Sequence, residues 1–318
     1  KLSNAAKSAK ITEFEEKKVS KKAITVQIPD NVENVKVSFD GSYVSYVVNG
    51  KIEVMSVDKK NVVNIIGKDN TELTYYNWLP DKNMIIYAYK TNNYTRVGIT
   101  TYDVDNEIEH DYPAITKNTS LPSGSEVVDI QLSAKTNVTY VKVKISDTQA
   151  KVVRYDIHEE IYYIMTTDIN TDMRKIHLFD YLAYKNPYEN KIVFRQGLSG
   201  ASHSLTFDAN IDLVDGDSEY SVYVGEYDAN GNVYKLYKGS YEDKSLESWQ
   251  QIVLQKPVPY QNIFVVGTSV YIYVESEKAV YNVGTGNKTS VDGQLFDVIE
   301  RYAVTLDGNK VKIIPLKS

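Results

Sequence analysis

One stretch of the sequence has acidic residues at the spacing of a cation-binding loop. In residues 208–219, oxygen-bearing side chains stand at positions 1, 3, 5 and 12 of a twelve-residue segment. Hard oxygen ligands at such intervals can wrap a calcium ion. The candidate ligands are Asp208, Asn210, Asp212, Asp215, Asp217 and Glu219. Leu213 stands where such a loop needs glycine, so the alternative is a solvated loop between strands, with Asp and Gly forming its turns.

Nucleophilic catalysis has little support in the sequence. Residues 197–203 combine Ser199, Ser202 and His203, but a catalytic triad also needs a third group that orients the base, and no G-x-S-x-G elbow is present. We expect a Gly- and Ser-rich turn here. The four His residues show no metal-binding spacing, and His158 is expected in an exposed turn. The chain has no cysteine, which excludes disulfides and thiol chemistry.

Carboxylate catalysis and sugar binding are left open. The chain has 42 Asp and Glu residues, so a pair acting as acid and base on a glycan can be recognised only from its geometry. Trp78 and Trp249 could form aromatic platforms for sugars, but we expect both to pack between sheets. Most of the 27 Tyr residues alternate within predicted strands, which also favours packing.

The elements that would position these residues are short strands. Residues 35–57 contain three alternating apolar runs, separated by Asp40-Gly41 and Asn49-Gly50. Asn-Gly between two such runs is a strong hairpin signal, because a type I′ turn needs positive φ at both central residues. The stretch therefore predicts a three-stranded meander.

Related units begin near residues 35, 75, 128, 176, 220, 262 and 296. This spacing of about 35 to 55 residues, with four short strands per unit and no long helical segment, is typical of a β-propeller. We predict seven blades, with six as the alternative because residues 176–238 can be divided differently. The last unit shows only three strands, and residues 23–28 form a lone strand. We expect that strand to complete the last blade and close the ring.

Two of these units carry a family resemblance. Residues 37–46, VSFDGSYVSY, and residues 78–87, WLPDKNMIIY, are similar to the repeated blade motif of TolB-like and prolyl-oligopeptidase-type propellers. The first copy lacks the proline of that motif, and residues 132–140 form a degraded third copy. The resemblance implies a propeller fold and no particular activity, since such propellers serve as binding platforms, peptidase gates and scaffolds.

Composition narrows the partner and the compartment. The net charge of −6 argues against nucleic-acid binding. Residues 1–22 are rich in Lys and predict a solvated stalk or linker, followed by a single propeller domain over residues 23–318. We expect an extracytoplasmic protein, secreted or membrane-anchored, with any anchor lying upstream of residue 1. No cofactor is expected apart from the candidate calcium ion.

Three hypotheses about the function follow from these features of the sequence. The first is a non-enzymatic scaffold that binds a protein or peptide where the loops gather. The second is an enzyme acting on a glycan or peptide through carboxylates at the channel mouth. It predicts acidic and aromatic side chains from three or more blades, with raised carboxyl pKa values. The third is a purely structural module, which predicts no pocket.

Overall fold

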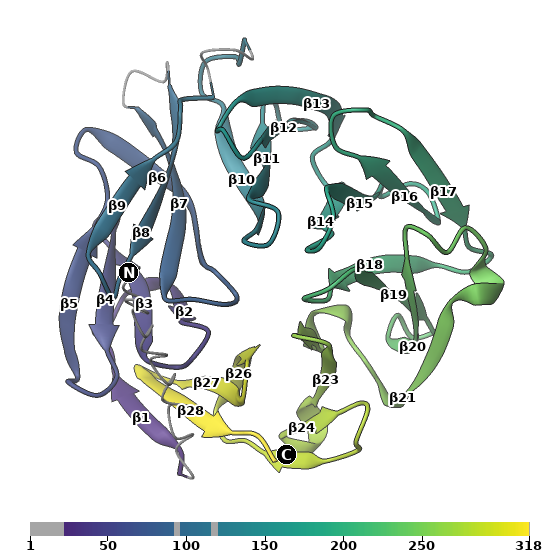
Figure 1. Ribbon diagram of the computed structural model, residues 1–318. Coiled ribbons are helices and arrows are strands. Elements are labelled where there is room, and N and C mark those ends of the chain that lie inside the picture. Colours follow the sequence, from purple (N-terminus) through teal and green to yellow (C-terminus); the bar gives the residue numbers. More distant parts are fainter. Residues whose placement is uncertain (1–21, 92–95, 116–119, 318) are drawn as a thin grey trace, which may run out of the picture.

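The chain folds into a seven-bladed β-propeller. The computed structural model describes residues 22–91, 96–115 and 120–317. Its strands form seven antiparallel sheets of four strands each, arranged in a ring (Figure 1). The prediction of an all-β propeller with seven blades is confirmed, and the six-bladed alternative is wrong. The stalk predicted for residues 1–22 lies outside the described residues, apart from Lys22.

Each of blades 1 to 3 is a continuous meander. Blade 1 consists of β2 (Glu33–Val37), β3 (Tyr43–Val48), β4 (Lys51–Ser56) and β5 (Asn61–Ile66). Blade 2 consists of β6 (Thr71–Trp78), β7 (Met84–Thr91), β8 (Val97–Asp103) and β9 (Ile108–Asp111). Blade 3 consists of β10 (Glu126–Ser133), β11 (Val138–Lys144), β12 (Gln149–Tyr155) and β13 (Ile161–Asp168).

Blades 4 to 6 repeat this order, and blade 7 differs in its outer strand. Blade 4 consists of β14 (Asp172–Lys175), β15 (Tyr181–Lys185), β16 (Lys191–Gln196) and β17 (Ser202–Thr206). Blade 5 consists of β18 (Ile211–Gly216), β19 (Ser221–Tyr227), β20 (Val233–Ser240) and β21 (Gln250–Val258). Blade 6 consists of β22 (Ile263–Val266), β23 (Ser269–Val274), β24 (Ala279–Asn282) and β25 (Lys288–Ser290). Blade 7 consists of β26 (Gln294–Ile299), β27 (Tyr302–Asp307), β28 (Lys310–Pro315) and β1 (Ile24–Gln27).

The first strand closes the ring, as the sequence predicts. β1 pairs antiparallel with β28, with Val26 opposite Val311, and the sheet order of blade 7 is β1-β28-β27-β26. Ile28 extends the pairing by donating its amide hydrogen to the carbonyl of Asn309 at 2.9 Å. The last blade therefore joins strands from both ends of the chain, so the ring cannot open without breaking this sheet.

Local turn chemistry sets the strand register. Asn49 and Gly50 both have positive φ, at 50° and 74°, as the predicted type I′ hairpin requires. The strands on either side pair in register, Val48 opposite Lys51 and Tyr43 opposite Ser56. Helix is confined, within the described residues, to three short 3-10 turns: η1 (Leu246–Ser248), η2 (Tyr260–Asn262) and η3 (Glu275–Glu277). None of the described helices has the length and apolarity needed to cross a membrane.

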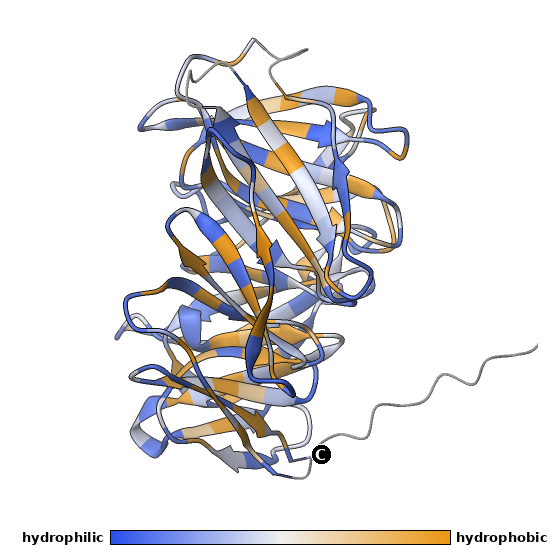
Figure 2. Cartoon of the chain, turned by 90° about the vertical axis from the view of Figure 1, so that its left-hand side faces the viewer, coloured by the Kyte–Doolittle hydropathy of each residue, from blue (hydrophilic) through white to orange (hydrophobic). Residues whose placement is uncertain are grey.

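The core lies between the blades. Seven clusters of buried apolar side chains occur, and each joins two neighbouring blades, including blade 7 to blade 1. Hydrophobic residues accordingly concentrate along the strands, and the connecting turns are mostly hydrophilic (Figure 2). Burying a large apolar side chain contributes about 1.5–3 kcal/mol. Each blade interface therefore stabilises the ring, and no single blade has a core of its own.

The two tryptophans belong to these interfaces, as predicted. Trp78 stacks on Tyr43 between blades 1 and 2, with the ring centroids 6.1 Å apart. Trp249 is 4% exposed and packs between blades 4 and 5. Its ring lies against Gly239, where a Cβ atom would stand 2.1 Å from Trp249 Cδ2. Glycine is required at position 239 because of this close approach.

Candidate functional site

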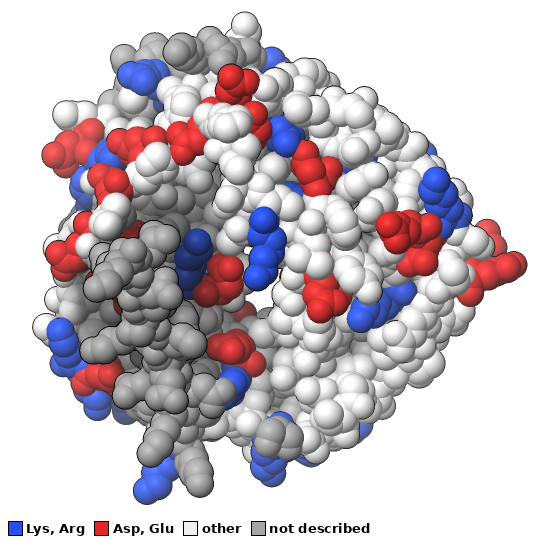
Figure 3. Space-filling model, viewed as in Figure 1, with Lys and Arg blue, Asp and Glu red and all other residues white. Residues whose placement is uncertain are grey.

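The strand nearest the ring centre in each blade lines a central channel. These innermost strands are β2, β6, β10, β14, β18, β22 and β26, and successive ones from β2 to β26 contact each other. All seven run in the same direction, so their starts gather at one face and the turns that follow them gather at the other. We call these openings the start-side mouth and the turn-side mouth. Charged side chains of both signs surround the ring centre (Figure 3).

A layer of equivalent residues forms the waist of the channel. In each blade, the second residue of the second strand pairs with one residue of the innermost strand. The waist residue is the one that comes just before that partner in the chain. The seven are Lys36, Asn77, Gln131, Arg174, Asp215, Phe264 and Asp297. Asn77, Gln131 and Asp215 line cavities at both mouths, so the two cavities meet at this layer. Register shifts interrupt five of the seven innermost strands, and such bulges re-aim side chains at the rim of a sheet.

The start-side mouth opens into a cavity of about 650 Å³ that is lined by residues of blades 2, 3, 4 and 5. Its two innermost cations are bound to the protein's own oxygens. Arg174 contacts Asp215 Oδ1 through Nε at 3.2 Å, and its Nη2 donates to Val214 O at 3.1 Å. Lys142 Nζ donates to the carbonyl of Thr171 at 2.6 Å and to that of Ile169. Arg174 therefore joins the innermost strands β14 and β18, and Lys142 of β11 holds the segment that leads into β14.

Three carboxyl groups of this mouth have pKa values above the ordinary one. Burial raises the pKa of Asp129, Asp172 and Asp215, and the nearby Arg174 opposes the rise. Asp215 lies deep in the ring, yet 47% of its side chain is accessible to water in the channel, which limits the shift. At the waist, burial also raises the pKa of Asp297 to about 6. The second hypothesis predicts such a cluster, with acids here from blades 3, 4 and 5 and Tyr75 from blade 2.

The turn-side mouth opens into a cavity of about 670 Å³ with a different lining. Apolar side chains come from blades 2, 3, 4 and 6: Trp78, Leu79, Pro80, Leu132, Leu178 and Val265. The ionisable residues of the same cavity are Asp81, Asp215, Asp217, Glu219, Lys135 and His177. Burial, and then the charge of nearby Lys175, lowers the pKa of His177, which is therefore neutral at pH 7. The third hypothesis predicts no pocket, and both cavities count against it.

Hydrogen bonds join successive turns around this mouth into a collar. Ser133 Oγ donates to the carbonyl of His177 at 2.6 Å. The Leu178 amide donates to Glu219 O, and the Ser218 amide donates to Gly267 O, both at 2.9 Å. The collar thus runs from blade 3 to blade 6 and holds the turns at fixed positions. Three large side chains on its turns are exposed, Leu178 and Phe179 at 41% each and Tyr220 at 45%.

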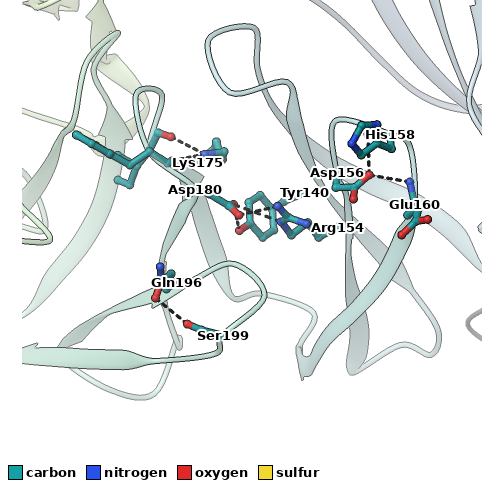
Figure 4. A network of polar contacts seen from close by, with 11 residues as sticks. Tyr140, Arg154, Asp156, His158, Glu160, Lys175, Asp180, Gln196 and Ser199 are labelled. Carbon is teal, nitrogen blue, oxygen red and sulfur yellow. Dashed lines mark hydrogen bonds and ion pairs between the residues drawn. The ribbon is translucent and has the colours of Figure 1, made fainter.

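A buried polar network supports the turn of blade 4 (Figure 4). Asp180 accepts hydrogen bonds from Arg154 Nη2 at 2.6 Å and from the Tyr140 hydroxyl at 2.7 Å, so blade 3 holds the end of this turn. Lys175 Nζ donates to the carbonyls of Ile176 and Phe179. Burial lowers the pKa of Lys175 to about 8. Leu178 is therefore presented at the mouth by a turn that is fixed at both ends.

Asp217 is the most deeply buried acid of the turn-side mouth, with 2% of the residue exposed. Its Oδ1 accepts the amide hydrogens of Glu219 at 2.9 Å and Ser221 at 3.0 Å. Its Oδ2 is buried without a hydrogen-bond partner among the described residues, and Lys238 Nζ lies 3.9 Å away. A buried acceptor without a hydrogen bond costs about 1–3 kcal/mol, so this oxygen can gain from an added donor.

The six candidate calcium ligands do not surround one point. Half of the stretch is strand β18 (Ile211–Gly216), where the sequence had indicated a loop. Asp212 accepts from the Tyr227 hydroxyl at 2.7 Å, Asp215 contacts Arg174, and Asn210 Oδ1 accepts from Asn190 at 3.3 Å. Asp208 is exposed in the turn before β18, while Asp217 and Glu219 lie at the turn-side mouth. A strand sends alternate side chains to opposite faces and cannot wrap one cation. No group of three or more His, Asp or Glu among the described residues is arranged to hold a metal ion.

The other predicted turns are where the sequence places them. Ser199 lies in the turn after β16 and donates to Gln196 Oε1 at 2.7 Å, so its hydroxyl is engaged there (Figure 4). His203 lies in β17, and its ring stacks on Phe194 with centroids 5.3 Å apart. His158 is exposed in a turn held by Asp156. Residues 197–201 form the expected turn, whereas Ser202 and His203 begin strand β17.

Sequence reasoning missed Asp129, Asp172, Arg174 and the collar turns. These residues come together only when seven strands, far apart in the sequence, meet at the ring centre. One signal was available: a polar or charged residue stands just before six of the seven blade turns, as Lys36 does before 37–41 and Asp297 before 298–301, with Phe264 as the exception. A repeated charge at that position indicates a channel lining.

The comparisons with known proteins agree with a propeller. No protein-family model matches the sequence, and no curated protein matches it. Among solved structures, the chain is similar to U3-55K, with a TM-score of 0.55 and 12% identity, covering 93% of this chain and 98% of that one. It is also similar to the β-propeller domain of Myceliophteria thermophila Cps50 (Swd1), with a TM-score of 0.52 and 11% identity, covering 92% and 100%.

A third similar structure is the β-propeller domain of the Trilobed protease from Pyrococcus furiosus, with a TM-score of 0.54 and 11% identity, covering 93% and 94%. That domain is described as having an open velcro topology, whereas here β1 completes the last sheet. At these identities the likeness establishes the fold alone. The resemblance to TolB-like repeats therefore stays a prediction.

Proposed function

We propose that this chain is a binding propeller that holds a peptide segment of a protein partner at the turn-side mouth. The observation that carries the proposal is the 670 Å³ cavity, enclosed by a hydrogen-bonded collar whose turns expose Leu178, Phe179 and Tyr220. Cavities of about 300–1,000 Å³ with apolar walls and a few fixed polar groups are typical binding sites. A preformed collar also reduces the entropy lost when the partner binds.

Crosslinking from paired positions tests the proposal. A photoreactive amino acid at Leu178 or Tyr220 should capture one discrete partner, and the same residue at Val128 should not. Val128 lines the start-side mouth and is 37% exposed, so it is a matched control. Once the captured partner has been purified, the Leu178→Glu variant should bind it at least tenfold more weakly, a loss of about 1.4 kcal/mol. The variant loses the apolar contact of Leu178 and must desolvate a charge when the partner binds. Equal effects of Leu178→Glu and Val128→Glu would refute the turn-side site.

A second function has support at the start-side mouth. Asp129, Asp172 and Asp215 have raised pKa values in one cavity, so part of each carboxyl population stays protonated at mildly acidic pH and can act as a general acid. The substrate would be a glycan or peptide that reaches the channel. Turnover of a glycan or peptide library that is lost in Asp172→Asn, with the fold intact, would establish this activity. No turnover by the wild-type chain would remove it.

We further propose that the protein works outside the cytoplasm. The Lys-rich residues 1–22 support this location, since such a segment can lie near anionic headgroups. Protease added to intact cells of the source organism should then digest the protein. Full protection in intact cells, with digestion after lysis, would place it inside.

A further inference from the structure

We infer that the segment bound at the turn-side mouth presents a lysine or arginine side chain to the channel, an inference that rests on the proposed function. The cavity is acidic: Asp81, Asp215, Asp217 and Glu219 face Lys135 as the one Lys or Arg of its described lining. His177 adds no charge at pH 7, because its pKa lies below the ordinary value. Ion pairs with Arg174 and Lys238 offset part of the charge of Asp215 and Asp217, but the rim acids leave the lining net acidic, so it favours a cation over an acidic segment.

The acids are placed at successive depths. Asp81 and Glu219 are exposed at the rim, on turns of blades 2 and 5. Asp217 lies in the wall, and Asp215 lies at the waist. A basic side chain that enters from the rim meets carboxylates along its whole path. The rim acids steer its approach, and the deeper ones contact it where the channel water is sparse.

Asp215 Oδ2 can accept a hydrogen bond from such a group, whereas Asp217 Oδ2 is buried beside the cavity. Asp217 Oδ2 is buried and has no hydrogen bond within the described part of the chain, and its ion pair with Lys238 is long at 3.9 Å. Asp215 uses Oδ1 for Arg174 and for the Gly216 amide at 2.8 Å, and no hydrogen bond is assigned to its Oδ2 among the described residues. An ammonium or guanidinium group carries several N–H donors and no acceptor. It can donate to Asp215 Oδ2 in the channel, and its charge is attracted to the Asp217 carboxylate in the wall.

The apolar lining suits the rest of the side chain. Trp78, Leu132 and Leu178 line the same cavity as the acids, so they can cover the methylene stem of a lysine or arginine while its charged end reaches deeper. The exposed Phe179 and Tyr220 lie on the adjoining turns and can bind apolar neighbours of the basic residue. The expected ligand is therefore a segment with one basic residue next to apolar ones.

Peptide selection followed by substitution tests this inference. Phage-displayed random 12-residue peptides are panned on the full chain and counter-selected on Leu178→Glu. The enriched sequences should share a Lys or Arg flanked by apolar residues. In fluorescence polarisation, the best peptide should lose about tenfold in affinity when citrulline replaces its arginine, or norleucine its lysine, as expected for a charged contact. We call it the selected peptide.

The protein side of the contact is tested by charge-neutral variants. Asp217→Asn keeps an oxygen for the amides of Glu219 and Ser221, and should weaken the selected peptide about tenfold. Asp81→Asn with Glu219→Gln changes only exposed rim residues, and should weaken it about threefold and reduce its salt dependence. Asp292→Asn, which changes an exposed acid outside both cavities, is the matched control and should change affinity less than twofold.

The possible outcomes distinguish a failure of this inference from a failure of the proposed function. Selected sequences that need Leu178 but lack a basic residue would overturn this inference and leave the proposed function in place. Unchanged affinity in both Asp217→Asn and the rim double variant would overturn it as well. If no peptide survived the counter-selection, because all of them bound the wild type and Leu178→Glu equally, the proposed function itself would be overturned.

Discussion

The two mouths of the channel are built from the same seven strands, but their charges are used differently. At the start-side mouth, Arg174 and Lys142 are bound to carboxylate and carbonyl oxygens of neighbouring blades. At the turn-side mouth, acids face an apolar lining with one Lys, and Asp217 Oδ2 has no hydrogen bond among the described residues. The comparison teaches that charges paired within the ring stabilise it, whereas charges left incomplete offer a binding site.

The largest expected effect comes from removing the start-side cation. Arg174→Met leaves Asp215 without its ion pair and removes the hydrogen bonds to Val214 and Tyr260. Breaking a fully buried ion pair costs about 3–5 kcal/mol, and the water that reaches Asp215 reduces this to about 2–3 kcal/mol. Chemical denaturation should show that loss, while the exposed Arg301→Met should change stability by less than about 0.5 kcal/mol. If Arg174→Met were as stable as the wild type but no longer bound the selected peptide, the start-side charges would serve binding and not stability, contrary to this comparison.

The next effect concerns the support of the turn-side mouth. Asp180→Asn weakens three charge-assisted hydrogen bonds, two from Arg154 and one from Tyr140, and should lower the free energy of unfolding by about 1–3 kcal/mol. Because the turn that carries Leu178 then loses its anchor, affinity for the selected peptide should fall as well. The control is Asp292→Asn, whose ion pair with Lys312 is exposed and contributes at most about 1 kcal/mol. Unchanged affinity in Asp180→Asn would mean that the collar needs no anchoring from blade 3.

The smallest effect is a pH dependence at the waist. Burial raises the pKa of Asp297 to about 6, above its value in the unfolded chain. The folded state therefore binds this proton more tightly, and the resulting stability is present below about pH 4 and is lost as the pH rises towards 6. Asp297→Asn should become more stable than the wild type over that interval, by about 1–2 kcal/mol after allowance for channel water. The exposed Glu300→Gln should show no such change, and parallel pH profiles for Asp297→Asn and the wild type would disprove the shift.

Much of the fold could be predicted from local signals. Asn49 and Gly50 dictate a tight hairpin through their backbone preferences, and the lone strand 23–28 needs a partner to cover an open edge. Strand β18 could not be recognised the same way, because an innermost strand faces water and carries acids where other strands carry apolar residues. Asp212, Asp215 and Asp217 therefore looked like ligands of a loop.

The candidate site could not be predicted from local signals in the sequence, and the reason is geometric. Leu178 meets Glu219 only because blades 4 and 5 are neighbours in the ring, and Trp78 reaches the same cavity from blade 2. Nothing in the spacing of these residues along the chain encodes that meeting. The sequence predicts that loops gather on one face, but not which turns are joined by hydrogen bonds or which acids lack a partner.

Hydrogen–deuterium exchange with the selected peptide tests most directly the claim that binding belongs to the turn-side mouth. Backbone amides of residues 176–180 and 217–220 should exchange more slowly when the peptide is bound, and those of residues 126–129 and 169–172 should be unchanged. Protection of residues 126–129 and 169–172, with no change in the turns of blades 4 and 5, would contradict the account.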